Sequence, residues 1–197
     1  MRSFFTITHT DGKHQQVLDS KFKNENIKNE LISNKIYKKT IEIYTDGSLI
    51  KNAKGVFCGY GVYIPSKNYK KSARLKPTIE YPKKTNNRAE LTAIIKALQL
   101  FSPKKHKKTL FKIYTDSSYS ILIFTKTGDK YERQNYRTSN GKYVKNHDLV
   151  KIIQKIKKLY RFELFHIRSH TGAKDIHSRG NAIADELAVL GAKKDIK

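Results

Sequence analysis

The chain has 197 residues and one cysteine, and its 41 lysine and arginine residues outnumber its 17 acidic residues to give a formal net charge of +24. This length predicts one domain with an additional arm, and the single Cys58 excludes an internal disulfide framework and a thiolate zinc site, which fits a reducing compartment. No segment approaches the ~20 apolar residues of a membrane span, and the polar sequence after residues 1–5 leads us to expect no secretory leader.

The positive charge belongs to the body of the chain. Residues 1–39 hold eight basic and four acidic residues, so that +20 of the net charge lies in residues 40–197. A polyanion is the expected partner of such a body, and nucleic acid is the commonest polyanion. An AT-rich genome also favours lysine, but that bias does not account for the scarcity of acids.

Residues 1–39 are rich in lysine and asparagine and show no periodic pattern. We interpret them as an N-terminal arm of unknown role that is loosely ordered. The folded domain is expected at residues 40–192, followed by a basic tail at residues 193–197.

Three strands are predicted at the start of the domain. Thr40–Thr45 alternates and ends at Asp46-Gly47-Ser48, Val56–Ile64 is a second strand closed by Pro65, and Tyr69–Ile79 is a weaker third strand. Consecutive strands joined by short turns indicate an antiparallel meander.

Helices and strands alternate after the meander. Asn86–Phe101 has apolar residues at the i, i+3, i+4, i+7 spacing of a helix, Thr109–Thr115 is a strand, and Ser117–Phe124 is a short helix. Lys126–Lys145 is a polar, basic stretch that carries tyrosines, and the element order includes an optional helix there.

A helix, a strand and a helix complete the domain. Asn146 is expected to cap the first helix, Phe162–Ile167 forms the strand, and Ala182–Leu190 forms the last helix, which Gly191 ends. Hairpins followed by strand–helix alternation predict an α/β fold in which helices cover a mixed sheet. The apolar set of the helix after Asn146 is Leu149, Ile152, Ile153, Ile156 and Leu159.

One short sequence occurs twice, 70 residues apart. Ile43–Ser48 and Ile113–Ser118 both read Ile-Tyr-Thr-Asp-x-Ser, and each places an aspartate, Asp46 or Asp116, at the end of an apolar strand. Each aspartate taken singly is better explained by a turn or a helix cap. If the two strands are neighbours, however, the two carboxylates meet at the edge of the sheet.

Glu90 and Asp185 are further acidic candidates on predicted helices. Alone, Glu90 is a favourable charge near a helix N-terminus, and Asp185 pairs with one of the many lysines. Two carboxylates ~4 Å apart, however, repel by about 4 kcal/mol at an effective dielectric of 20, so a cluster of four acids raises its own pKa values or binds cations. Mg²⁺ suits carboxylates around a phosphate, and two such ions stabilise both the attacking and the leaving oxygen of a phosphodiester displacement.

Four segments in this order resemble the motifs of the type 1 ribonuclease H family. They are Tyr44–Ser48 (YTDGS), Thr85–Leu91 (TNNRAEL), Tyr114–Ser117 (YTDS) and Gly180–Ala188 (GNAIADELA). The resemblance covers residues 40–192 and implies a ribonuclease H-like five-stranded mixed sheet flanked by helices. It also implies an endoribonuclease that hydrolyses the RNA strand of RNA–DNA hybrids with two Mg²⁺ ions, for which Mn²⁺ can substitute, and that leaves 3′-OH and 5′-phosphate ends.

The resemblance also implies catalytic roles for individual residues. His170 matches a loop histidine that assists proton transfer or product release, as suits a side chain that titrates near neutrality. His177, in the same long loop, is the second candidate for that role. The metal-binding carboxylates of the family match Asp46, Glu90, Asp116 and Asp185, with Asp46 between the two ions.

Contacts to the hybrid are implied at further positions. Asn86 and Asn87 match residues that read the minor groove, where the 2′-OH distinguishes RNA from DNA, and Lys83 stands where some members have arginine. Backbone groups near Gly47 and Ser48 are expected to help. The remaining contacts are Thr85 and Asn146, which match part of a pocket for a DNA phosphate, and Tyr131 and Tyr136, which take the place of the tryptophans that other members carry in a basic protrusion.

Three other functions remain open at this point. A junction resolvase or integrase core is disfavoured by the run Asn86–Glu90 and by His170, and a non-catalytic nucleic-acid-binding module would not need four acids. A ribonuclease domain fused to a polymerase would need a longer chain. We expect an intracellular monomer, in the cytoplasm or the nucleus, without a membrane partner, and the sequence leaves a viral source open.

Overall fold

The computed structural model describes residues 37–194 except 79–80, 83 and 169–174. Apart from its last three residues, the predicted N-terminal arm lies outside the described residues, and of the predicted tail only Lys193 and Lys194 are described. No helix within the described ranges is both long and apolar enough to cross a membrane.

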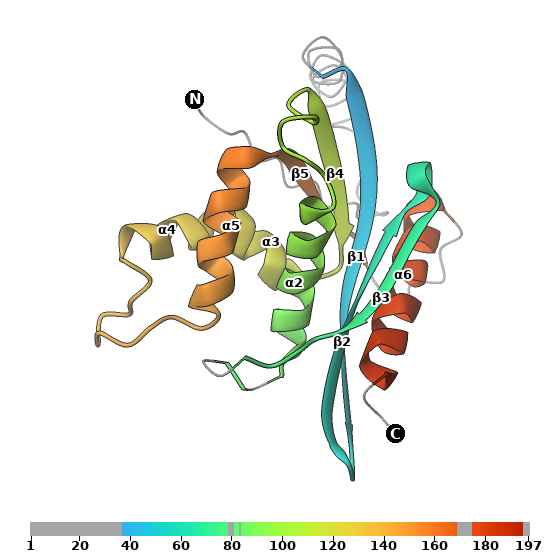
Figure 1. The fold of residues 1–197 in the computed structure, drawn as a ribbon. Coiled ribbons are helices and arrows are strands. Elements are labelled where there is room, and N and C mark those ends of the chain that lie inside the picture. The colour runs from blue at the N-terminus through green and yellow to red at the C-terminus, as the bar shows by residue number, and fades with distance from the viewer. Residues whose placement is uncertain (1–36, 79–80, 83, 169–174, 195–197) are drawn as a thin grey trace, which may run out of the picture.

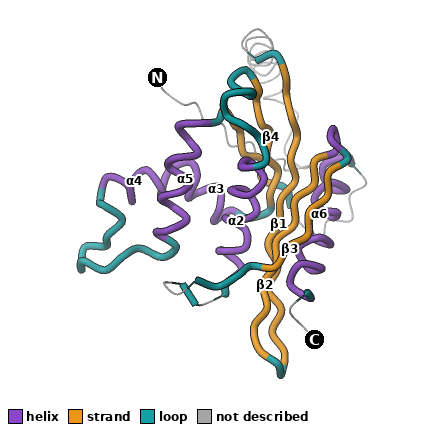
Figure 2. Tube along the Cα trace, viewed as in Figure 1, coloured by secondary structure: helices purple, strands orange, loops and turns teal. Residues whose placement is uncertain are grey.

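A five-stranded mixed sheet forms the centre of the molecule (Figures 1 and 2). Its strand order is β3-β2-β1-β4-β5; the pairs β1–β2 and β2–β3 are antiparallel, and the pairs β1–β4 and β4–β5 are parallel. The predicted meander and mixed sheet are therefore confirmed. The strands are β1 (Lys39–Asn52), β2 (Gly55–Ile64), β3 (Tyr69–Arg74), β4 (Thr109–Thr115) and β5 (Arg161–His166).

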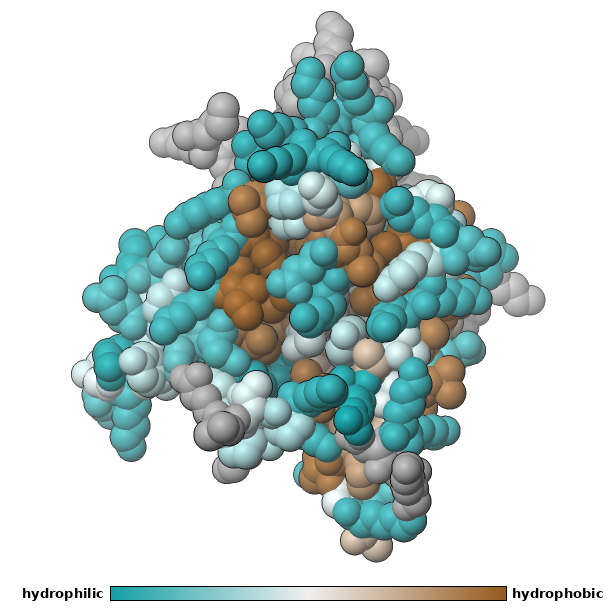
Figure 3. Space-filling model, in the orientation of Figure 1, coloured by the Kyte–Doolittle hydropathy of each residue, from teal (hydrophilic) through white to brown (hydrophobic). Residues whose placement is uncertain are grey.

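Helices cover both faces of this sheet (Figure 1). The main core lies between the sheet and α2 and α5, while α6 packs on the opposite face against β1, β2 and β3. Hydrophilic side chains cover most of the face seen in Figure 3, with apolar residues gathered in its middle. The helical elements are α2 (Asn86–Gln99), α3 (Ser118–Leu122), the π-helical turn η2 (Ile123–Thr127), α4 (Gly128–Arg133), α5 (His147–Leu159) and α6 (Ile176–Lys193), and a short 3-10 turn, η1 (Pro65–Lys67), joins β2 to β3.

The 70-residue spacing of the repeated sequence is the register of the β1–β4 pair. Ile43 pairs with Ile113 and Tyr44 pairs with Tyr114 in parallel strands. Because parallel strands run in the same direction, Asp46 and Asp116 reach the same end of the sheet. The hypothesis that the two repeats are neighbouring strands is confirmed.

Helix α6 begins earlier and ends later than predicted. It starts at Ile176, where the Asp175 side chain caps the backbone N–H groups of His177 and Ser178, and it continues to Lys193. Gly191 therefore does not end the helix. It lies inside α6, and a Cβ there would come 2.4 Å from the backbone oxygen of Ala73, so the glycine allows the helix to approach β3 closely.

Glycines on β2 allow the same close approach from the other side. A Cβ at Gly59 would lie 2.1 Å from the backbone nitrogen of Ala192, and a Cβ at Gly61 would lie 2.1 Å from the backbone oxygen of Ala184. The α6 backbone therefore lies in direct contact with β2.

Other element boundaries also differ from the predictions. The strand predicted at Tyr69–Ile79 ends at Arg74, where its pairing with β2 ends. The helix expected at Asn86–Phe101 ends at Gln99, and the helix expected at Ser117–Phe124 continues through η2 into α4. This continuation enters the stretch Lys126–Lys145, where the predicted element order allowed an additional helix, and an ion pair between Asp129 and Lys157 of α5 holds it there.

The apolar face of α5 is shifted from the predicted one. Leu159, at the end of the helix, is exposed, and Ile152 is only partly buried. Val150 and Gln154 are buried instead, together with the correctly predicted Leu149, Ile153 and Ile156. The buried face of α5 is therefore rotated from the predicted apolar stripe toward Val150 and Gln154.

Replacing Gly61 with alanine tests the close packing of α6 on β2. The added methyl group would overlap the α6 backbone, and overpacking of this kind costs about 1–3 kcal/mol. For a domain of this size, thermal unfolding monitored by circular dichroism should show a midpoint lower by at least about 2 °C. Lys71→Ala, at an exposed position of β3, serves as the control and should stay within about 0.5 kcal/mol of the parent; an unchanged midpoint for Gly61→Ala would contradict the described packing.

Candidate active site

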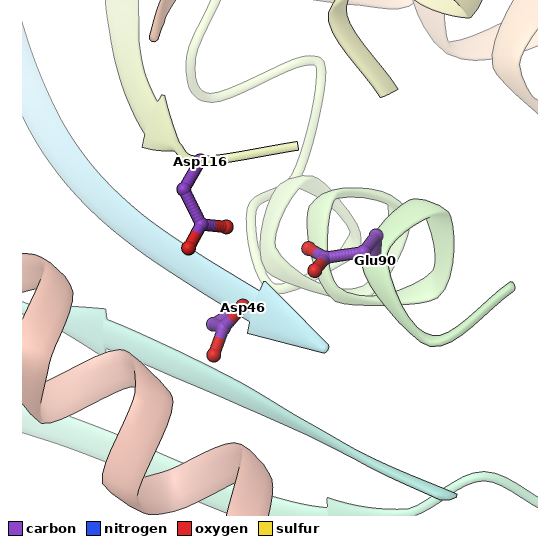
Figure 4. Close-up of side chains that lie close together, drawn as sticks. All are labelled: Asp46, Glu90 and Asp116. Carbon is purple, nitrogen blue, oxygen red and sulfur yellow. The ribbon is translucent and has the colours of Figure 1, made fainter. Parts of the chain in front are cut away.

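Three carboxylates from distant parts of the sequence meet at one end of the sheet (Figure 4). Asp46 of β1, Glu90 of α2 and Asp116, which follows β4, each offer an oxygen atom, and these atoms all lie within 4.8 Å of one another. Asp46 and Glu90 are only 5% and 4% exposed, whereas Asp116 is half-buried. The predicted convergence of these three residues is confirmed.

Local sequence explains how α2 brings Glu90 to β1. The Thr85 hydroxyl caps α2 by accepting a hydrogen bond from the Arg88 backbone N–H at 3.3 Å. A Cβ at Gly47 would lie 2.4 Å from the Glu90 backbone nitrogen, so that only glycine at this position allows the helix to approach the strand so closely. The Asp-Gly pair in the first repeat therefore has a packing role besides the turn that its sequence suggested.

Asp185 approaches the cluster from α6 but is not part of the group of three. A side-chain interaction with Asp185 is among the causes that raise the pKa of Asp46, which indicates that the two carboxyl groups lie close together. Asp185 is carried by α6, which packs on the opposite face of the sheet from α2 (Figure 1).

The cluster strongly disfavours full ionisation. Burial, followed by the charges of Asp46 and Asp116, raises the pKa of Glu90 well above its ordinary value. Burial, the charge of Asp116 and the hydrogen bond with Asp185 raise the pKa of Asp46. These are the shifts expected where carboxylates share a desolvated site without a compensating cation.

The donor set fits a divalent cation. The Glu90 Oε2 atom is buried and has no hydrogen-bond partner among the described residues, and an unsatisfied buried oxygen of this kind is costly unless something binds it. Carboxylate oxygens within 4.8 Å of one another are typical ligands of Mg²⁺, which prefers oxygen ligands.

The predicted contacts to nucleic acid surround this cluster. Asn86 and Asn87 are exposed at the start of α2, and the Asn86 amide donates a weak hydrogen bond of 3.4 Å to Glu90 Oε1. Gly47 is buried and Ser48 half-buried next to Asp46 on β1. These four residues are thus close in sequence to Asp46 or Glu90, and their contacts to nucleic acid stay predictions.

The prediction that the Asn146 side chain caps α5 is wrong. Asn146 has a left-handed backbone conformation with φ 60°, and its side chain makes no capping hydrogen bond. Instead the amide is buried, with Oδ1 accepting from Arg88 at 3.2 Å and Nδ2 donating to the Tyr119 hydroxyl at 3.0 Å. Asparagine tolerates a positive φ well. The Asn146 side chain connects α2 and α3 to the start of α5 and does not cap a helix.

The two tyrosines that were expected to stack on nucleic acid are less exposed than a third tyrosine of the same stretch. Tyr131 and Tyr136 are half-buried and pack against the main core. Tyr143, which the sequence analysis did not single out, is 51% exposed, lies 4.2 Å from the Arg137 guanidinium and stacks on the His147 ring at 4.1 Å. A tyrosine directly after Gly141-Lys142 in a basic stretch was the signal that could have identified it.

Of the two histidine candidates, His177 is among the described residues and His170 is not. Lys83 also lies outside the described residues. His177 lies in the first turn of α6, where its ring is hydrogen-bonded to the Tyr44 hydroxyl at 2.9 Å and stacks on Tyr114.

Comparisons with known sequences agree with this geometry. A family model described as RNase H matches residues 38–193. A ribonuclease H of Orientia tsutsugamushi (strain Boryong) is 36% identical over 157 residues, which are 80% of this chain and 84% of that protein. A ribonuclease H of Schizosaccharomyces pombe is 30% identical over 98% of this chain and 69% of its own length, so that this alignment also includes most of residues 1–39.

Solved structures share the fold. The solution structure of the PFV RNase H domain has a TM-score of 0.60 at 24% identity and covers 78% of this chain and 94% of that chain. LC11-RNase H1, isolated from compost by a metagenomic approach, has a TM-score of 0.52 at 25% identity and covers 80% of this chain and 99% of its own.

Glu90→Gln should stabilise the protein in the absence of metal. The folded state raises the pKa of Glu90 above its ordinary value of 4.5, so the folded state binds more protons than the unfolded state above that pH and loses stability as the pH rises. The amide cannot ionise and avoids this loss. In EDTA at pH 8 we therefore expect a melting midpoint at least about 3 °C above the parent, since one pKa unit corresponds to about 1.4 kcal/mol.

The same measurement has an internal check. The advantage of Glu90→Gln should shrink as the pH falls toward 4.5, where the parent carboxyl group is protonated in both states. Glu186→Gln, an exposed acid on α6, should show no such pH-dependent advantage. A midpoint for Glu90→Gln at or below that of the parent at pH 8 would mean that the raised pKa of Glu90 does not lower the stability of the folded protein.

Proposed function

The chain belongs to the ribonuclease H family, and we propose that it is an endonuclease that hydrolyses the RNA strand of RNA–DNA hybrids at the cluster of Asp46, Glu90, Asp116 and Asp185. One observation carries this proposal. Three carboxylates that are far apart in the sequence lie within 4.8 Å of one another, at positions that match the acidic motifs of the family.

The cluster would hold two Mg²⁺ ions, with Mn²⁺ as a substitute. Bound there, the ions would activate a water molecule and stabilise the attacking and leaving oxygens. Attack of this water on phosphorus with breakage of the bond to the 3′ oxygen would give 3′-OH and 5′-phosphate ends. Asp46, Glu90, Asp116 and Asp185 are the residues that would hold the ions. Divalent charge would also offset the repulsion that keeps protons on Asp46 and Glu90.

Proton transfer and product release are assigned to His170. His177 is a poorer candidate because its ring is occupied by Tyr44 and Tyr114. A free imidazole near the reacting phosphate is what such a step needs, since a neutral ring must take up a proton and release it again.

Electrostatics and polar side chains would bind the hybrid. Asn86 and Asn87, exposed next to Glu90, are placed to contact the minor groove where the RNA strand shows its 2′-OH groups, and Tyr143 offers a stacking surface. The segment 47–79 contains no acidic residue. Its basic residues are Lys51, Lys54, Lys67, Lys70, Lys71, Arg74 and Lys76.

A substrate panel tests the reaction class. The parent protein is incubated with a labelled RNA–DNA hybrid, duplex RNA, duplex DNA and a four-way junction, each with Mg²⁺ or with EDTA. We expect cleavage of only the RNA strand of the hybrid, and only with metal. Cleavage of the junction would favour a resolvase, and binding without cleavage would favour a non-catalytic module.

Asp116→Asn should abolish cleavage but preserve hybrid binding. The amide keeps the size of the side chain but removes the negative charge that attracts the metal. Loss of a residue that only hydrogen-bonds to a metal ligand already costs 10–100-fold in metal affinity or activity. Because Asp116 is itself a proposed ligand, we expect the cleavage rate to fall by more than about 100-fold. Retained activity would refute the role of Asp116, and Glu186→Gln is the matched control that should cleave normally.

The salt dependence of binding tests the electrostatic contribution. Hybrid affinity of the Asp116→Asn variant is measured by fluorescence anisotropy from low to physiological salt. Contact with about six phosphates predicts a log–log slope near −5. A flat response would contradict a binding surface based on the lysine-rich body.

A further inference from the structure

A row of aromatic rings crosses the sheet directly behind the aspartates. Tyr44 stacks on Tyr114 with ring centres 4.9 Å apart and an angle of 15°, Tyr63 lies 5.9 Å from Tyr44, and Phe165 lies 5.0 Å from Tyr114. These four residues are register partners on β2, β1, β4 and β5. Because alternate residues of a strand share a face, Tyr44 lies on the same face of β1 as Asp46, and Asp116 directly follows the last residue of β4.

The first turn of α6 is anchored on this row. The His177 ring stacks on Tyr114 with centres 4.3 Å apart and an angle of 26°, and its Nδ1 atom is 2.9 Å from the Tyr44 hydroxyl. A Cβ at Gly180, one turn later, would lie 2.5 Å from the Tyr44 ring.

Helix α6 connects His177 to Asp185 of the proposed metal site. Asp185 follows His177 by eight residues in the continuous helix α6, which is about 12 Å at 1.5 Å per residue. The glycine contacts with β2 set how closely the helix approaches the sheet. The stacked and hydrogen-bonded ring of His177 adds a directional contact at the start of the helix.

We propose that His177 is a positioning residue: through Tyr44 and Tyr114 it fixes the rotation and axial position of α6 and so holds Asp185 against Asp46 for binding of a divalent cation. The proposal rests on the proposed function of the carboxylate cluster. It assigns to His177 no contact with substrate, which separates it from the role given to His170.

Metal binding measured without nucleic acid tests this assignment. The affinity of the full-length protein for Mg²⁺ alone is determined by isothermal titration calorimetry for the parent, His177→Ala, Tyr44→Phe and the control Arg179→Ala, an exposed residue of the same helical turn. We expect His177→Ala to bind Mg²⁺ more weakly, but by less than the 10–100-fold lost when a hydrogen-bond partner of a metal ligand is removed, because His177 acts on Asp185 only through α6. Tyr44→Phe, which keeps the ring but loses the hydroxyl, should show a smaller loss, and Arg179→Ala should match the parent.

Cleavage assays separate positioning from participation in the reaction. For His177→Ala the Mg²⁺ concentration that gives half-maximal cleavage should rise about as much as the dissociation constant. At saturating Mg²⁺ the value of kcat should stay within about twofold of the parent, with an unchanged pH profile. Circular dichroism confirms that each variant is folded, and Tyr44→Phe alone still tests the proposal if His177→Ala does not fold.

Three results would overturn the proposal. Parent-like Mg²⁺ affinity in both variants, with only a lower melting midpoint, would reduce His177 to a structural residue. A lower kcat at saturating Mg²⁺ with an altered pH profile would make His177 a participant in the reaction. Absence of Mg²⁺ binding in the parent itself would refute the proposed function of the cluster, and the positioning role would fall with it.

Discussion

Mutual repulsion of buried carboxylates is the constraint on which the rest of this structure depends. At ~4 Å and an effective dielectric of 20, each pair of charges costs about 4 kcal/mol, and Asp46 and Glu90 are almost completely removed from water. The local sequence contributes to this arrangement through the Thr85 cap of α2 and through Gly47, which lets that helix approach β1. The arrangement persists because the surrounding packing is strong enough to impose it, as is typical of sites that trade stability for function.

Three packing features impose the arrangement, and each uses a different physical device. The β1–β4 register places Asp46 and Asp116 at one end of the sheet through backbone hydrogen bonds. Gly47 lets α2 approach β1 until backbone atoms nearly touch. On the opposite face, glycines and small residues let α6 lie flat on β2 and β3, and the ring of His177 defines where along the sheet that helix stands.

The few acids outside the site are used in a contrasting way. Burial raises the pKa of Asp148, but hydrogen bonds from the Arg88 guanidinium at 2.9 and 2.7 Å outweigh it, and the net shift is downward. Asp129 and Glu132 likewise pair with Lys157 and Lys158 and attach α4 to α5. Acids with a basic partner thus join helices, whereas the clustered acids have raised pKa values and no basic partner among the described residues that cause these shifts, which leaves them available to a cation, in a protein whose +24 net charge favours polyanions.

The sequence by itself determined the order of the strands and helices, the mixed sheet and the pairing of Asp46 with Asp116, because hydrophobic periodicity and the repeated Ile-Tyr-Thr-Asp are local patterns that need no knowledge of distant contacts. Only the tertiary structure decided the length of α6, the roles of Asn146, Gly191 and His177, and the exposure of Tyr143 rather than Tyr131. Each of these depends on which distant atoms meet the residue. Gly191 looks like a helix end in sequence, yet it lies inside a helix because the backbone of Ala73 occupies the space that a side chain would need.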